Sequence, residues 1–257
     1  MRGGLVAIGL GAALLAPATA HAGRNFYGWL TDTDVMPERG VEMQSWLAEE
    51  NHEDTEGGRS TTEWGVAPYV GVTDQLELAL PVAVEWFGKT GGGAGTALSN
   101  FGAELRYRMV TNDPQDRPPF APLVRFGLRR LIRERDTTET NVGVSGSYEA
   151  GRVHALADVN FVGDINRDDT VFALHAGAGV SVEVIDDVRV GAEVFAHIEL
   201  KGPKPPPMPP PMEPPTNWAI AGPGASWTHG RFWLSAMYGI GIANIGTAPR
   251  VQWGIAF

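Results

Sequence analysis

The chain has 257 residues, a formal net charge of −10, 33 glycines, eight tryptophans and no cysteine. The lack of cysteine excludes disulfides, thiolate metal sites and a cysteine nucleophile, and the negative charge argues against a nucleic-acid partner, because phosphate binding needs an excess of Lys and Arg. Beyond about the first two dozen residues no apolar run reaches the ~18 residues of a membrane-spanning helix, so the composition fits a soluble all-β protein or an outer-membrane barrel.

The first 22 residues have the pattern of a secretory signal peptide. Arg2 supplies the positive start, residues 5–15 form a short apolar stretch, and the small residues Ala20 and Ala22 occupy the positions that a signal peptidase reads. An uncleaved anchor helix is the alternative, but the apolar stretch is short for one. We therefore expect cleavage after Ala22, an N-terminal segment at 23–39 and one barrel domain at 40–257.

The remainder of the chain alternates with a period of two. The clearest example is residues 75–86, in which Leu, Val and Trp occupy one face and Gln, Glu and Ala occupy the other. This alternation is typical of a strand with one apolar face and one polar or small face.

Twelve such segments follow one another along the chain. They lie near 40–51, 61–72, 76–88, 98–110, 121–134, 138–149, 152–163, 169–184, 188–200, 217–228, 231–242 and 248–257. Each has about ten residues or more, which is enough for a tilted strand to cross a bilayer, whereas strands of soluble proteins have about five or six. The sequence predicts a single antiparallel transmembrane β-barrel of about 12 strands, and a soluble β-sandwich is the alternative.

Short turns predict the pairing registers of four hairpins. They are centred near Thr73-Asp74, Ala150-Gly151, Asp186 and His229-Gly230. The expected partners are Val70 with Leu78, Trp64 with Val84, Glu149 with Arg152, Ser147 with His154, Glu183 with Arg189, and Trp227 with Phe232.

Longer connections at 89–97, 164–168, 201–216 and 243–247 alternate with these short turns. That alternation is typical of outer-membrane barrels, whose short turns are periplasmic. The Pro-rich stretch at 202–215 is expected to be an extended extracellular loop, with a partner-docking segment as the alternative. The last strand ends at Phe257 and resembles the signal read by the barrel assembly machinery, which we expect to be a partner.

The stretch from Tyr69 to Leu78, Tyr-Val-Gly-Val-Thr-Asp-Gln-Leu-Glu-Leu, resembles a strand-turn-strand motif of the phenol-degradation meta-pathway transporter-like outer-membrane proteins. The resemblance covers about residues 40–90. It implies a barrel channel or uptake porin, with hydrophobic or aromatic solutes as the expected cargo.

If the apolar faces meet lipid, the opposite faces line the lumen. The candidates for a selective lining are Glu77, Glu85, Arg106, Arg108, Arg125, Arg129, His175 and His197. Acidic and basic sectors on different walls would set a field across a narrow passage. Alternatively these groups pair with one another and fill the lumen.

The register at Asp186 also places His175 opposite His197, with Glu199 one step away. Two imidazoles and a carboxylate can form a hydrogen-bonded pair, a pH-sensitive constriction or a metal site, and we expect no metal and no cofactor. The predicted function is passive diffusion of small solutes through a monomeric barrel in contact with outer-membrane lipid. The alternatives are a plugged structural barrel whose loops bind a partner, and an outer-membrane enzyme, which we do not expect.

Overall fold

The computed structural model describes residues 25–52, 59–89, 92–111, 113, 116–132, 137–167, 170–201 and 217–257. The expected signal peptide and the Pro-rich loop lie outside these ranges. Thirteen strands are assigned within them. Their bounds are β1 Val41–Asn51, β2 Arg59–Gly71, β3 Leu76–Ala79, β4 Val82–Lys89, β5 Gly92–Arg108, β6 Phe120–Leu131, β7 Thr137–Ala150, β8 Val153–Ile165, β9 Thr170–Ile185, β10 Val188–Lys201, β11 Trp218–His229, β12 Phe232–Ala243 and β13 Thr247–Ala256.

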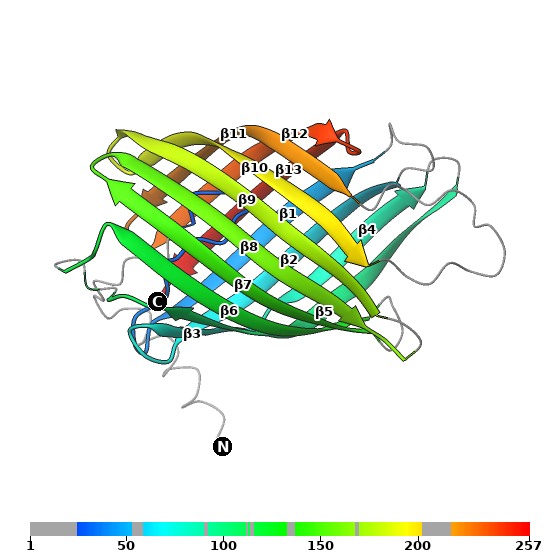
Figure 1. The fold of residues 1–257 in the computed structure, drawn as a ribbon, viewed down its shortest axis with the longest axis horizontal. Coiled ribbons are helices and arrows are strands. Elements are labelled where there is room, and N and C mark those ends of the chain that lie inside the picture. Colours follow the sequence, from blue (N-terminus) through cyan, green and yellow to red (C-terminus); the bar gives the residue numbers. More distant parts are fainter. Residues whose placement is uncertain are drawn as a thin grey trace, which may run out of the picture.

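The strands form one closed antiparallel barrel of twelve crossings (Figure 1). Each crossing pairs with the next along the chain, and β1 closes the ring by pairing with β13. The third crossing is divided into β3 and β4 at Leu80-Pro81, and both pieces pair with β2 and β5. Proline has no N–H to give to the ladder, so the strand is interrupted there without leaving its place in the barrel.

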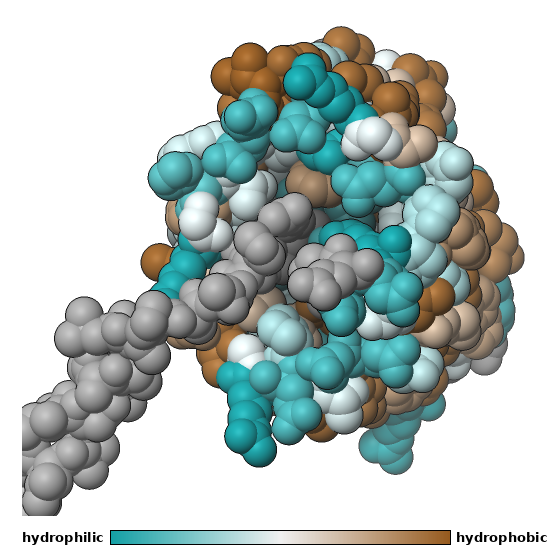
Figure 2. Space-filling model, turned by 90° about the vertical axis from the view of Figure 1, so that its left-hand side faces the viewer, coloured by the Kyte–Doolittle hydropathy of each residue, from teal (hydrophilic) through white to brown (hydrophobic). Residues whose placement is uncertain are grey.

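Apolar side chains face outward and polar side chains face inward, as the alternation predicts. Val144 and its neighbour Ser145 on β7 illustrate this, with exposed fractions of 55 % and 1 %. Viewed onto one end, hydrophobic residues cover the outer wall and hydrophilic residues surround the mouth (Figure 2). The outer surface therefore suits lipid, and closure satisfies the backbone groups that lipid cannot. No helix in the described residues is long and apolar enough to cross a membrane.

Two of the four predicted registers are confirmed and two are wrong. Val70 pairs with Leu78, and Glu183 pairs with Arg189. At 150–153, however, Glu149 pairs with His154 and Ser147 pairs with Leu156, and at 229–232 His229 rather than Trp227 pairs with Phe232.

Glycine geometry explains the two wrong registers. Gly151 and Gly230 both have φ of 59° and each is the first of two turn residues. A two-residue hairpin turn accepts glycine with positive φ at that place, so each turn lies one residue later than the sequence indicated. The inward and outward faces are preserved. The expected loop at 89–97 is also corrected, because β5 already begins at Gly92.

Candidate functional site

The segment before β1 lies inside the barrel. Tyr27, Leu30, Val35 and Met36 are all almost completely buried. Tyr27 and Leu30 pack in a cluster with lumenal residues such as Phe195, whereas Met36 packs with Trp233. At its end, the N–H of Arg39 donates to the carbonyl of Gly71 beside a short turn. The segment therefore fills the half of the lumen next to the short turns.

Carboxylate side chains of the barrel wall accept hydrogen bonds from backbone N–H groups of this segment. Glu193 accepts hydrogen bonds from the N–H groups of Gly28 at 2.6 Å and Trp29 at 2.9 Å. Glu77 accepts from the N–H of Met36 at 2.7 Å. None of these contacts belongs to a strand pairing, and wall side chains satisfy the buried N–H groups of Gly28, Trp29 and Met36.

Arginines of the barrel wall bind carbonyl groups of the segment. Arg106 donates to the carbonyl of Asp32 at 2.7 Å, and Arg108 donates to the carbonyl of Thr33 at 3.0 Å. The carboxylate of Asp34 lies 2.6 Å from Arg108 and 2.5 Å from Arg117. Arg108 has no exposed side-chain surface, so its charge is compensated within the barrel.

A second buried network centres on His154, which is not among the predicted lining residues. The hydroxyl of Tyr27 donates to the carbonyl of His154 at 2.9 Å and lies 3.1 Å from Nδ1. Since the hydroxyl has one proton, Nδ1 must be the donor in the second contact. Nε2 faces the Asp32 carboxyl at 3.7 Å, so an ionisable group of the wall lies next to one of the segment.

Five of the predicted lining residues lie on one row of hydrogen-bonded strand partners. The row runs through Glu77, Arg106, Arg125, Gly143, Asn160, His175, His197 and Trp218. It starts next to a short turn and ends at the first residue of β11, next to a long connection. Because barrel strands are tilted, a row across them climbs around the lumen from one mouth towards the other.

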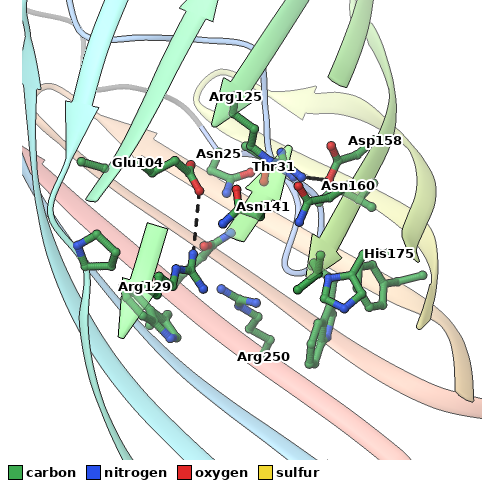
Figure 3. Close-up of a pocket in the computed structure, with 18 of the residues that line it drawn as sticks. Asn25, Thr31, Glu104, Arg125, Arg129, Asn141, Asp158, Asn160, His175 and Arg250 are labelled. Carbon is green, nitrogen blue, oxygen red and sulfur yellow. Dashed lines mark hydrogen bonds and ion pairs between the residues drawn. The ribbon is translucent and has the colours of Figure 1, made fainter. Parts of the chain in front are cut away.

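All members of the row except Gly143 line a cavity of about 510 Å³ in the lumen, and Arg125, Asn160 and His175 are labelled in Figure 3. Polar side chains such as Arg125, Asn141 and Asn160 line one side, and Phe195 and Trp218 line another. The N-terminal segment contributes residues 25, 28–32 and 34 to the lining. The lumen is thus divided into a filled half and a hollow half.

The predicted residues have different roles. Glu77, Arg106 and Arg108 contact the N-terminal segment, as described above. Arg125 pairs with Asp158 at 3.0 Å, and Glu85 lines a separate cavity of about 360 Å³.

The other predicted residues line the main cavity. Arg129 lies 3.8 Å from Glu104 and 3.5 Å from Glu139. His175 and His197 are hydrogen bonded at 2.8 Å, as their register predicts. Among the described residues, no group of three or more His, Asp or Glu side chains is arranged to hold a metal ion.

Acidic and basic groups therefore do not face each other as separate open sectors. Most lumenal arginines have a carboxylate partner, as in the paired alternative. The sequence missed Asp34, His154, Glu193 and Arg250. Glu193 and Arg250 lie at inward positions that the alternation marks, but nothing in the sequence indicates that a preceding segment returns into the lumen.

Comparisons with known proteins show the fold. No protein family matches the chain, and no curated protein matches it. An outer-membrane channel from Pseudomonas putida F1 is similar in structure, with a TM-score of 0.62 and 10% identity over 88% of this chain and 98% of that chain.

Two further structures have similar barrels. The beta domain of the Bordetella autotransporter Brka has a TM-score of 0.52 and 11% identity over 85% of this chain and 99% of that chain. The NanC porin has a TM-score of 0.50 and 8% identity over 84% and 98%. The chain thus has the fold of Gram-negative outer-membrane barrels, and the narrower resemblance at Tyr69–Leu78 stays a prediction.

Proposed function

We propose that this protein is an outer-membrane channel for passive diffusion of small solutes, with the N-terminal segment narrowing its path. The observation that carries the proposal is the lumen itself, which holds a polar cavity of about 510 Å³ next to a segment bound without strand pairing. A segment held by side-chain contacts can be displaced while the ring of strands stays closed. The channel from Pseudomonas putida F1, which is similar in structure over 98% of its own chain, supports the proposal.

Several narrower proposals accompany this function. Residues 1–22 direct export and are removed, and the strand ending at Phe257 is recognised by the barrel assembly machinery. The barrel acts as a monomer. Aromatic side chains beside the cavity, such as Trp218 and Phe195, favour solutes with an apolar part.

A plugged structural barrel is the second candidate. Burial of Tyr27, Leu30 and Met36 favours it, because these contacts hold the segment in place. In that case the described contacts would fix the segment permanently, and extracellular loops would carry the function.

Planar-bilayer recording of residues 23–257 separates the two candidates. The channel proposal expects stepwise currents and swelling of liposomes in small solutes. Arg129→Gln should change the cation-to-anion preference, because Arg129 lines the cavity, whereas Arg152→Gln at an exposed turn should not. Folded barrels that carry no current and admit no solute would leave the plugged barrel as the function.

A further inference from the structure

Arg250 on β13 has an unusual position among the lumenal arginines. Within the described part of the chain no carboxylate lies within ion-pair distance of its guanidinium, and its buried Nε has no hydrogen-bond partner. Its guanidinium lies over the ring of Trp29, whose centroid is 5.2 Å from Cζ. By contrast, Arg106 and Arg125 each have a carboxylate oxygen within 3.0 Å.

Arg129 on β6 reaches the same cavity from the other side of the barrel (Figure 3). Its two ion pairs are long, at 3.8 Å and 3.5 Å, and its Nε also lacks a hydrogen-bond partner. Two guanidinium groups from separate walls thus have unused donors around one space. A carboxylate is the ligand group that such planar donors bind best.

Further unsatisfied polar atoms belong to the same cavity. The side-chain oxygens of Asn141 and Asn160 are buried and have no partner among the described residues. Buried polar atoms are normally paired, so such a concentration in one lining points to a polar ligand. The amide N–H groups of both residues can donate to a ligand carboxylate, whereas their oxygens can accept only from a donor such as a hydroxyl or a water molecule.

The aromatic part of the lining lies next to Arg250. Trp29 packs against Phe195 with ring centroids 5.3 Å apart and against Trp218 at 5.6 Å. All three residues line the cavity. An apolar ring on the ligand can pack against them while its charged end lies at the arginines.

We propose that the cavity is a binding site for a small carboxylate that carries a flat apolar ring, of which benzoate is the simplest example. Its carboxylate lies between Arg129 and Arg250, and its ring packs against Trp29 and the aromatic wall. This inference rests on the proposed function in that a solute must enter the lumen. Because Trp29 belongs to the N-terminal segment, occupancy of the site depends on the docked position of that segment.

Calorimetric titration of residues 23–257 in detergent tests the site with four probes. Benzoate should bind, whereas benzyl alcohol, which lacks the charge, and glucuronate, which lacks the flat apolar ring, should bind at least about tenfold more weakly. Cyclohexanecarboxylate, with a puckered ring, should lie between them. Benzoate should also reduce the single-channel current in a saturable manner.

Single substitutions test whether Arg250 and Arg129 bind the carboxylate of benzoate. Arg250→Gln and Arg129→Gln should each weaken benzoate binding at least about tenfold, and Arg250→Lys should retain part of it. Arg152→Gln, exposed at a turn, is the matched control and should bind as the parent does. Heat-modifiable migration in gels checks that each barrel is folded, and Arg250→Lys is the variant that least disturbs packing.

The outcomes separate this inference from the proposed function. Currents that benzoate does not affect, together with no benzoate binding, would overturn the site while the channel stands. Benzoate binding by a folded barrel that carries no current would support the binding site and contradict the proposed channel function. Equal binding of benzyl alcohol, or unchanged binding in both arginine-to-glutamine variants, would overturn the carboxylate assignment.

Discussion

His197 stacks on Trp218, its register partner on the neighbouring strand, with ring centroids 5.9 Å apart and planes 5° from parallel. The pair ends the oblique row that begins at Glu77. His197 is in turn hydrogen bonded to His175, and Trp218 packs on Phe195. Aromatic and imidazole rings therefore narrow the hollow half of the lumen on one side.

Removing the Trp218 ring should widen this side of the lumen. Trp218→Ala deletes a buried ring and should lower the free energy of unfolding by about 3–5 kcal/mol, while raising single-channel conductance. Trp227→Ala, on the outer face of the same strand, is the control and should leave conductance unchanged. Urea unfolding in detergent and bilayer recording provide the two readouts, and equal conductance in both variants would contradict a solute path past Trp218.

Neutralising Asp34 should loosen the N-terminal segment. Asp34→Asn removes the carboxylate that Arg108 and Arg117 share, and loss of a buried partner costs about 3 kcal/mol or more. We expect longer open times and faster proteolysis within residues 25–40. Asp74→Asn removes only an exposed charge that accepts from the N–H of Glu38 at the rim, and it should change neither rate. Protection equal to that of the parent would show that Asp34 does not hold the segment.

The docked position of the segment should depend on pH through Asp32. Burial raises the pKa of the Asp32 carboxyl, Asp34 raises it further, and His154 and Arg117 oppose the shift. The docked segment thus binds this proton more tightly than a released segment, whose Asp has a pKa of about 3.9. The Asp32 contribution to docking is therefore greatest at acid pH and declines as the pH rises through the raised pKa.

Comparison with Asp32→Asn isolates this contribution, because Asp34, Glu77 and Glu193 remain in both proteins. The parent should show a larger increase in open probability between pH 4 and pH 7 than the variant. Identical pH profiles of open probability in the parent and the variant would show that Asp32 does not make docking of the segment depend on pH.

A charged residue on the outward face should destabilise the barrel more the closer it lies to the middle of the membrane. Val144→Arg places a guanidinium on the lipid side near the middle of β7 and should destabilise the barrel by about 2–4 kcal/mol. Ile185→Arg, next to a short turn, should cost about 0–1 kcal/mol because it lies near the interface. Unfolding equilibria in lipid vesicles measure both, and similar costs at the two positions would argue against a membrane-facing wall.

The architecture could be predicted because one pattern determines it. Alternation assigns most inward and outward positions, although register shifts such as the one beside Ala83 and Val84 interrupt it. The register near Asp186 placed His175 opposite His197 correctly. The hairpins after Ala150 and His229 were misplaced by one residue, since either of two adjacent turn positions preserves the alternation. Only the positive φ of Gly151 and Gly230 decides between them.

The site was predicted less completely. Inward-facing charges such as Arg106 and Arg108 were identified from their alternation, but not their contacts with Asp32, Thr33 and Asp34. Those contacts depend on a segment without periodicity that folds back into the barrel. Long-range packing of this kind leaves no local signal in the residues that take part.

The most direct test of a channel narrowed by its N-terminal segment uses the absence of native cysteine. The hydroxyls of Thr33 and Ser147 lie 2.5 Å apart, so Thr33→Cys with Ser147→Cys should form a single disulfide that fixes the segment to the wall. Bilayer recordings of this variant should show small currents when it is oxidised and larger, longer openings after reduction, with neither single variant responding. Currents that are the same in both redox states, with the disulfide verified by mass, would contradict the account.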